Sequence, residues 1–180
     1  MNTLELIKKC LNKEPRAQRK LFDDYYRYIY TICFRYLQDH HDCQDVVSEV
    51  FNRVFSNIGK VYDTSNNGFK RWIQTIAINE SLRFLKRKRP VIYTDENIIL
   101  DGKEEVIEEQ ELLNTDQIWN IINEMPEGYR RIFLLHSIDG LTHAEISEYL
   151  SISRNTSKSQ LLKARKYILA QIRNYESERI

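Results

Sequence analysis

Cations and amides near the C-terminus form the set of side chains best suited to binding DNA. The stretch from Ser151 to Tyr175 contains six cations and no carboxylate, a net charge of +6. At helical spacing, an apolar side opposes a polar and basic side. The apolar side consists of Ser157, Leu161, Ala164 and Ile168, and the opposite side of Asn155, Ser159, Lys163 and Lys166, flanked by Arg154 and Lys158. A helix with this outward face fits the major groove, where amides and cations read base edges and phosphates.

The residues before this helix have the spacing of a helix-turn-helix. Thr142 followed by Glu145 matches a capping box, which predicts the start of a short helix. Ser151-Ile152-Ser153 predicts a tight break, and Ser153 can cap the second helix. The alternative is a two-helix hairpin whose charged face is only solvated. The capping box, the polar break and the one-sided charge together favour DNA binding.

A second basic block and an acidic block explain why the net charge of the chain is only +1. Between Lys70 and Pro90, seven cations and one carboxylate give +6, and four of the cations form the run KRKR. Between Asp95 and Asp116, nine carboxylates and one cation give −8. A helix C-terminus favours positive charge, but four consecutive cations exceed that need and indicate a polyanionic partner.

Composition points to an all-α protein without a catalytic or metal centre. The 180 residues include only 5 glycines and 3 prolines, which favours helices. No Gly-rich phosphate loop, metal-ligand cluster or nucleophile–base pair stands out, so we expect no enzyme activity and no cofactor. The three cysteines lack CxxC spacing, and no signal peptide or membrane-spanning segment is visible, which indicates the cytoplasm.

Hydrophobic periodicity divides the chain into two helical domains, 1–90 and 115–180, joined by an acidic linker at 91–114. The first domain should contain helices at 15–37, at 43–58 with Asp42 as N-cap, and at 69–89, ended by Pro90. Residues 59–68 should form a loop. In the second domain, helices should begin near Thr115 and at Pro126, the latter ending at Gly140, before the helix-turn-helix.

Three motifs, in their order along the chain, make the sequence resemble a bacterial RNA polymerase sigma factor of the extracytoplasmic-function (ECF) group of the sigma-70 family. DCQDVVSEVFNRVF at 42–55 is similar to the segment that docks on the polymerase clamp. FKRWIQTIAINESLRFLKRKR at 69–89 resembles the helix that melts and reads the −10 element. Residues 125–168 are similar to the reader of the −35 element. The resemblance covers about Leu11 to Ile172.

The resemblance implies a sigma factor that directs core RNA polymerase to promoters and helps to melt them, with an anti-sigma factor as a further partner and no small-molecule substrate. It implies polymerase binding by Asp45, Ser48, Glu49 and Asn52. It implies −35 contacts by Thr142, Arg154, Asn155, Thr156, Lys158, Ser159, Lys163 and Lys166. It implies −10 contacts by Lys70, Arg71, Trp72, Asn79, Arg83, Lys86, Arg87, Lys88 and Arg89. The acidic linker resembles the one that threads the RNA channel.

The sequence departs from the family pattern at several positions, including Asn155, which stands where relatives usually carry Gly. Arg83 stands where relatives usually carry Asp, and Ser157 stands on the buried side where they carry Val. Gln160 replaces a common Arg, and Leu162 is apolar near the outward face. The promoter sequence therefore cannot be copied from relatives.

Two other functions compete with this interpretation. The first is a stand-alone helix-turn-helix regulator whose N-terminal half senses a signal or dimerises. The KRKR helix and the Asp45/Glu49 segment discriminate against it, because such a regulator needs neither. The second is a helical adaptor that binds only proteins, which leaves both basic blocks unexplained.

Overall fold

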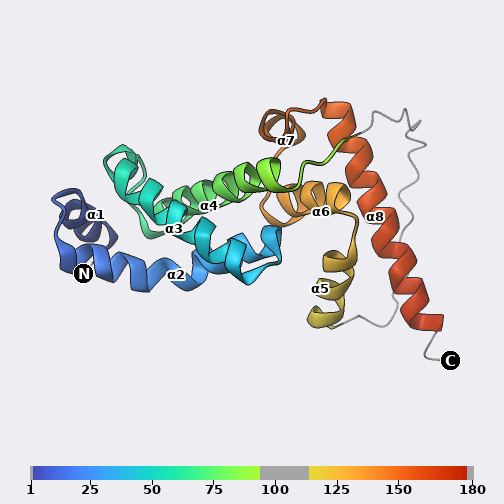
Figure 1. Ribbon diagram of the computed structural model, residues 1–180, viewed down its shortest axis with the longest axis horizontal. Coiled ribbons are helices and arrows are strands. Elements are labelled where there is room, and N and C mark those ends of the chain that lie inside the picture. Colours follow the sequence, from blue (N-terminus) through green and yellow to red (C-terminus); the bar gives the residue numbers. More distant parts are fainter. Residues whose placement is uncertain (1, 94–113, 178–180) are drawn as a thin grey trace. The chain divides into compact units, whose positions relative to one another are not determined.

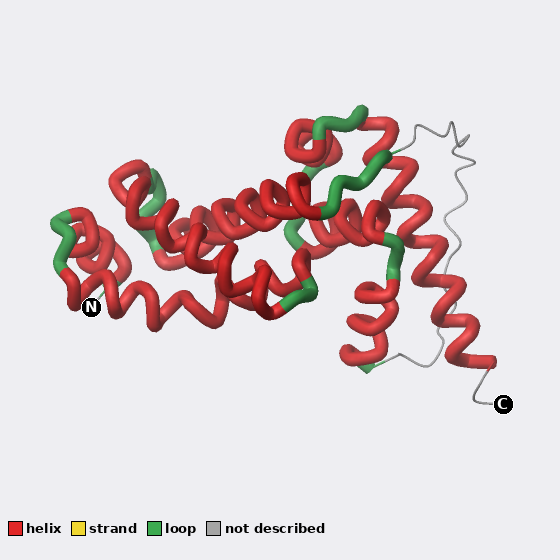
Figure 2. Tube along the Cα trace, in the orientation of Figure 1, coloured by secondary structure: helices red, strands yellow, loops and turns green. Residues whose placement is uncertain are grey.

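The computed structural model describes residues 2–93 and 114–177, and within these residues all regular elements are helices (Figures 1 and 2). The chain divides into two compact units, Met1–Pro90 and Val91–Ile180. The all-α expectation is confirmed. Each unit has its own apolar core.

Unit 1 is a three-helix bundle with a short helix packed at one end. Its elements are α1 (Thr3–Leu11), α2 (Pro15–Leu37), α3 (His40–Asn57), the 3₁₀ turn η1 (Ile58–Lys60) and α4 (Asn66–Lys88). Helices α2, α3 and α4 all pack against one another, and α1 packs on α2 and η1. Fully buried side chains from each long helix fill the centre, namely Leu21, Ile29, Ile32, Tyr36, Leu37, Val50, Phe69, Ile73 and Leu85.

The helices α3 and α4 each begin three residues before the predicted start, whereas α2 begins where predicted. Asp39, not Asp42, caps α3, because its carboxylate accepts the backbone N–H of Asp42 at 2.9 Å. Ser65 caps α4 through the N–H of Gly68 at 3.0 Å. The segment Asn66-Asn67-Gly68, expected to turn, is therefore the first turn of α4.

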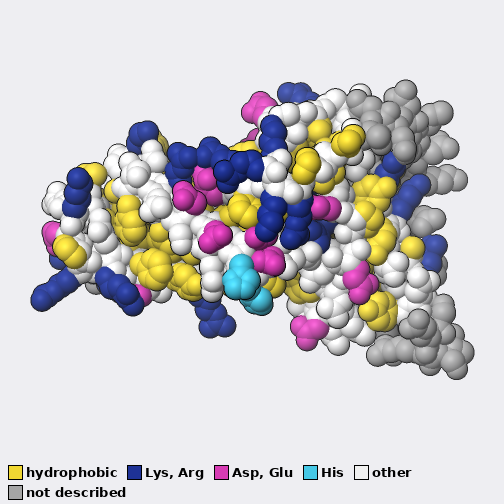
Figure 3. Space-filling view, viewed as in Figure 1, with side chains coloured by type: hydrophobic (Ala, Val, Ile, Leu, Met, Phe, Trp, Pro, Cys, Tyr) yellow, Lys and Arg dark blue, Asp and Glu magenta, His cyan; other side chains and the backbone are white. Residues whose placement is uncertain are grey.

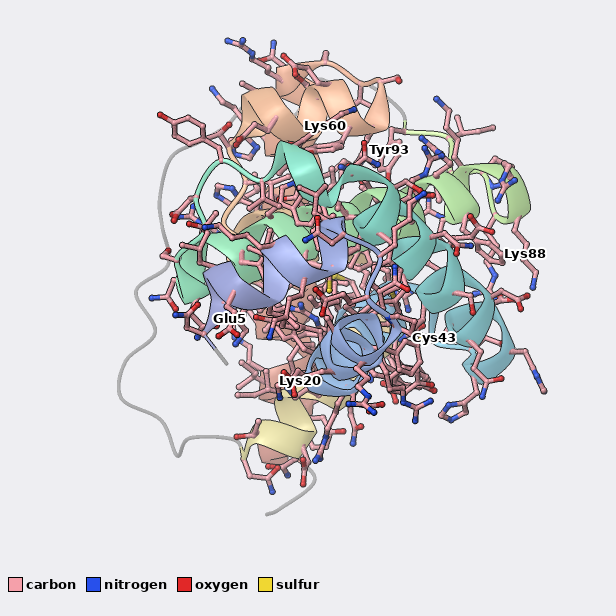
Figure 4. All side chains as sticks on the ribbon, turned by 90° about the vertical axis from the view of Figure 1, so that its left-hand side faces the viewer. Glu5, Lys20, Cys43, Lys60, Lys88 and Tyr93 are labelled. Carbon is pink, nitrogen blue, oxygen red and sulfur yellow. The ribbon has the colours of Figure 1, made fainter. Side chains whose placement is uncertain are left out.

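Asp42 is available for a different role, which is to join α3 to the end of α4. Its side chain is buried and accepts a short hydrogen bond from Lys88 Nζ, and Arg89 lies 3.7 Å away. Arg89 also donates to the carbonyl of Leu37 at 3.4 Å. Two of the four KRKR cations thus help to hold unit 1 together. Figure 4 labels Lys88.

Unit 2 contains α5 (Thr115–Glu124), α6 (Glu127–Phe133), the π-helical segment η2 (Leu134–Ile138), α7 (His143–Leu150) and α8 (Arg154–Ser177). Helix α8 packs against α5, α6 and α7. The core consists of Ile121, Ile122, Met125, Ile132, Leu134, Leu135, Ile146, Leu161 and Ala164. One long helix therefore provides the surface on which the three short ones assemble.

Local signals set the boundaries of the short helices in unit 2. Asn114 and Gln117 form a reciprocal capping box at the start of α5. Pro126 was expected to be the first residue of this helix, but it is the N-cap, and α6 begins at Glu127. Gly140 has φ +76, which few other residues adopt without strain, and it directly follows Asp139, the C-cap of η2.

The acidic linker expected at 91–114 lies almost entirely outside the described residues. Only its first three residues, Val91 to Tyr93, and its last, Asn114, are described. Val91–Tyr93 belongs to unit 2.

Candidate nucleic-acid interface

The turn between α7 and α8 has the geometry of a helix-turn-helix. Thr142 and Glu145 form the expected capping box, and the N–H of Thr142 holds the pKa of Glu145 below its usual value. Ser151 ends α7 in the left-handed region at φ 55. Ser153 caps α8, since its hydroxyl accepts the N–H of Thr156 at 3.0 Å. The predicted start, break and cap are all confirmed.

A polar contact and a ring stack fix α7 against α8. His143 Nδ1 lies 2.8 Å from the Ser157 hydroxyl, and both side chains are at least half-buried. His143 also stacks on His136, with ring centroids 4.6 Å apart. Burial lowers the pKa of His143, and the nearby His136, Lys158 and Arg165 lower it further. Ser157, which departs from the family pattern, is thus a partner for this histidine.

The outward face of α8 is basic, but its centre is shifted from the predicted one. Arg154, Asn155, Lys158 and Lys166 are exposed as expected, and Lys163 is half-buried. Thr156 and Ser159 are buried, at 3% and 7% exposure, and Ser159 donates to the carbonyl of Thr156 at 3.0 Å. The placement of Ser159 on the outward side is wrong, because α6 covers α8 from a second side.

The corrected face includes one cation that the sequence-based list of contact residues left out. Arg165 is exposed and follows Arg154 and Lys158 at steps of eleven and seven residues, which returns it to the same side of an α-helix. Leu162 is half-buried beside this row. The missed signal was the spacing of Arg165 from Arg154 and Lys158, which share one side of the helix with it.

A second candidate surface runs along α4 in unit 1. Trp72 is half-buried and stacks on the buried Phe69, with ring centroids 5.7 Å apart. Asn79, also half-buried, lies seven residues further on, and the exposed Arg83 and Lys86 follow at steps of four and three. These spacings place an indole, an amide and two cations along one stripe of the helix. Figure 3 shows basic side chains gathered along this helix.

Several cations of α4 already make contacts within unit 1. Arg83 lies 3.5 Å from Glu80, which also meets Arg53 at 3.3 Å. Lys70 Nζ lies over the ring of Tyr28, 4.5 Å from its centroid. Arg71, Lys86 and Arg87 are exposed. The predicted −10 residues therefore share one helix, but Lys88 and Arg89 at its end are tied to Asp42.

The polar face of α3 is exposed as predicted. Asp45, Ser48, Glu49 and Asn52 all have exposed side chains, opposite the buried valines of the same helix. Their spacing of three and four residues places them together on the helix surface. They form a continuous acidic and amide ridge, which we call the α3 ridge.

An exposed aromatic side chain in the loop before α4 was not anticipated. Tyr62 is 101% exposed between η1 and Ser65. In the same loop, hydrogen bonds from Ser65 hold the pKa of Asp63 below its usual value. A fully exposed ring near the start of α4 can stack on an unpaired base.

Neither a metal-binding cluster nor a membrane-spanning helix occurs in the part of the chain that the structure describes. Cys10, Cys33 and Cys43 are free thiols buried in unit 1. Cys43, labelled in Figure 4, contacts the carbonyl of Tyr30 at 3.5 Å.

Comparison with known proteins identifies both units. The family model described as Sigma-70 region 2 matches residues 21–91, and the one described as Sigma-70, region 4 matches residues 115–168. The chain is 30% identical over 187 residues to the ECF RNA polymerase sigma factor SigW of Bacillus subtilis (strain 168), covering 94% of this chain and 98% of that protein. The chain belongs to the ECF group of the sigma-70 family.

Other relatives agree with this assignment. The sigma factor is 24% identical to the ECF RNA polymerase sigma-E factor of Escherichia coli (strain K12), over 91% of this chain and 90% of that protein. Its fold resembles that of the sigma factor RpoE from Bartonella quintana, solved with the anti-sigma factor NepR, at TM-score 0.51 and 15% identity, over 86% of this chain and 96% of that one. Because relatives match over both halves, the stand-alone regulator finds no support.

The family gives the two surfaces their context. The sigma factor directs core RNA polymerase to promoters, with unit 1 as region 2 and unit 2 as region 4. The candidate −35 residues lie on α7 and α8 of region 4, and the candidate −10 residues lie on α4 of region 2.

Proposed function

We propose that α8 reads the −35 duplex through the face that contains Arg154, Asn155, Lys158, Arg165 and Lys166. The observation that carries this proposal is the exposure of these five side chains on the second helix of a helix-turn-helix with complete capping. Cations of such a helix bind phosphates, and amide and guanidinium groups read base edges. Leu162 is placed to meet a thymine methyl group.

The stripe along α4 holds the opened −10 strand. Trp72 offers a ring for stacking, Asn79 offers an amide for a base edge, and Arg83 and Lys86 attract phosphates. Extruding a base costs a few kcal/mol, so a surface that captures the extruded base couples recognition to melting. Tyr62 in the adjoining loop adds a second ring for stacking.

The α3 ridge docks on core polymerase. Its side chains are exposed although the apolar side of α3 is already buried in unit 1, so they are available to a basic partner. The acidic linker, residues 91–114, would thread the RNA channel of the polymerase, where its negative charge would mimic nucleic acid. An anti-sigma factor that covers such surfaces would regulate the protein, which acts in the cytoplasm without an active site of its own.

Co-purification with core RNA polymerase, followed by run-off transcription, tests the docking surface. Asp45→Arg with Glu49→Arg should weaken binding to core polymerase and make the residual binding less sensitive to salt, because both changes oppose a basic partner. Asp116→Arg with Glu148→Arg makes the same charge change on exposed positions of unit 2 and should leave core binding unchanged. Equal core affinity of the first variant and the parent would remove the α3 ridge as the docking site.

A further inference from the structure

An arginine of α3 and an arginine of α4 meet at one carboxylate where these two helices of unit 1 pack together. Arg53 Nε lies 3.3 Å from Glu80 Oε1, and Arg83 Nη1 lies 3.5 Å from the same oxygen. The side chain of Glu80 is only 11% exposed, whereas those of Arg53 and Arg83 are 49% and 55% exposed. A mostly buried anion therefore anchors two cations that both reach water. We call these three side chains the arginine cluster.

The arginine cluster keeps positive charge and hydrogen-bond donors for a second anion. Two guanidinium groups and one carboxylate leave a net charge of +1. A guanidinium has five N–H donors in a planar fork, and the contact with Glu80 uses one nitrogen of each arginine. Guanidinium groups bind phosphate through pairs of parallel hydrogen bonds. Because Glu80 offsets the repulsion between the two cations, both arginines are held together before any ligand binds.

The arginine cluster adjoins the stripe of α4 that contains Trp72 and Asn79. Arg83 belongs to both, since it follows Asn79 by about one helical turn, or about 6 Å along the axis. The exposed Lys86 follows Arg83 at a step of three residues. An amide suited to a base edge and a cation pair suited to a phosphate thus lie within one turn of each other. On nucleic-acid surfaces, phosphate contacts position the strand and base contacts specify it.

Arg53 extends this surface from α4 onto α3. It directly follows Asn52 of the α3 ridge along the chain, but its contact with Glu80 directs it towards α4. The sequence gave no reason to assign Arg53 to DNA binding, because its partner is 27 residues away on another helix. The fold alone brings this second guanidinium beside the stripe.

We propose that Arg53 and Arg83 form a phosphate subsite for the opened −10 strand, and that Glu80 is the positioning residue that holds the two guanidinium groups side by side. This subsite rests on the proposed function of the α4 stripe. The phosphate it binds belongs to a linkage close to the base that Asn79 contacts, because Arg83 is one helical turn from that amide. A backbone contact of this kind fixes the register of the strand whatever its bases are.

Neutral linkages in the DNA test the subsite. In a series of single-stranded −10 oligonucleotides, one phosphate at a time is replaced by an uncharged methylphosphonate. Fluorescence anisotropy then measures the affinity of each strand for holoenzyme assembled from core RNA polymerase and the full chain. One neutral linkage should lower the affinity of the parent about three- to tenfold. Arg53→Ala should weaken binding of the unmodified strand by about the same factor and no longer respond to that linkage.

The exposed Arg16 at the start of α2 provides a matched control. Arg16→Ala removes the same side chain from another part of unit 1 and should keep the parent's response to every linkage. Each comparison is made within one protein, so a change in polymerase binding cancels. If Arg53→Ala responds to every linkage as the parent does, the subsite is overturned. Weaker binding of core polymerase with that unchanged response would instead assign Arg53 to the α3 ridge.

The subsite and the proposed function fail in different ways. If the parent holoenzyme binds a scrambled strand as tightly as the −10 strand, the proposed reading of the −10 element by the α4 stripe fails. A linkage whose effect depends on Arg53 would still establish the phosphate subsite in that case. If the parent prefers the −10 strand but no linkage depends on Arg53, the stripe stands and the subsite is overturned.

Variants of Glu80 separate positioning from charge. Glu80→Ala removes a negative charge, so affinity for the unmodified strand should not fall. The two arginines lose their shared anchor, however, and the response to the single neutral linkage should be lost. Glu80→Gln keeps a side-chain oxygen that accepts from both arginines and should restore that response. A response in Glu80→Ala equal to that of the parent, or no difference between the two variants, would overturn the positioning role of Glu80.

Discussion

The two DNA-facing helices use their cations differently. In unit 1, α4 directs Lys88 and Arg89 to the buried Asp42 and Arg83 to Glu80, so part of its charge stabilises the fold. In unit 2, Arg154, Lys158 and Lys166 of α8 are exposed, and the described residues include no carboxylate paired with them. The positive charge of α8 is therefore available to phosphate, whereas that of α4 is partly neutralised. Residues 70–90 and residues 151–175 both have a net charge of +6, so net charge alone does not show this difference.

This comparison of α4 with α8 predicts that binding to the −35 duplex depends most on the cations of α8. Arg154→Ala with Lys158→Ala should weaken −35 duplex binding by about 2–4 kcal/mol and lower the slope of affinity against salt by about two, if both contact phosphates. Lys163→Ala should cost less, because Lys163 is half-buried. Fluorescence anisotropy over a range of salt concentrations measures both quantities. Lys8→Ala with Lys60→Ala, which removes two exposed cations from unit 1, is the control and should leave −35 affinity unchanged.

A second prediction concerns the stability of unit 1. Asp42→Ala should lower its free energy of unfolding by about 1–2 kcal/mol, because a buried carboxylate that binds Lys88 and Arg89 is lost while the cations remain half in water. Asp24→Ala, which removes an exposed ion pair with Lys20, should cost less than about 0.5 kcal/mol. Urea unfolding of both variants measures the two changes in the free energy of unfolding. Similar losses of stability in both variants would mean that the contacts of Lys88 and Arg89 with Asp42 stabilise unit 1 no more than an exposed ion pair does.

The third prediction concerns Asn79. Asn79→Ala should leave −35 binding and polymerase docking unchanged but reduce open-complex formation about three- to tenfold, the value of one hydrogen bond to a base edge. Permanganate reactivity of thymines in the −10 element measures it. A pre-melted bubble should restore transcription only in part. If the variant melts promoters as well as the parent, Trp72 and the basic end of α4 carry the melting without this amide.

The smallest effect should come from the pH dependence of stability at His143 in unit 2. The pKa of His143 is lowered in the folded state, so the neutral ring is favoured there. Its contribution to stability is complete above the unfolded pKa, near 6.5, and is lost as pH falls through that value towards the folded pKa. Thermal unfolding between pH 7.5 and 5 measures this loss. His143→Gln should flatten the dependence, and an equally steep dependence in that variant would assign the effect to other groups.

Sequence patterns predicted the helices well where one apolar stripe faces one neighbour. The bounds of α2 match the prediction, and the Thr142 box and Ser153 cap follow from short-range spacing alone. Patterns failed where a helix is covered from two sides. Ser159 and Gln160 are polar yet buried, because α6 packs on α8 at a place that no local pattern specifies.

Competition between capping residues explains the error at α3. Asp39 and Asp42 are both good caps, and the sequence does not show which carboxylate is needed elsewhere. The bond from Lys88, 46 residues away, assigns Asp42 to a tertiary role.

The chain contains two tryptophans, and each unit holds one of them: Trp72 in α4 and Trp119 in α5, both half-buried. The stack of Trp72 on Phe69 places this indole on the surface proposed to receive a base. A Trp119→Phe variant would therefore emit from Trp72 alone, and a stacked base should quench that emission. The protein thus carries an intrinsic optical signal for strand capture, which can be followed in real time without any added dye.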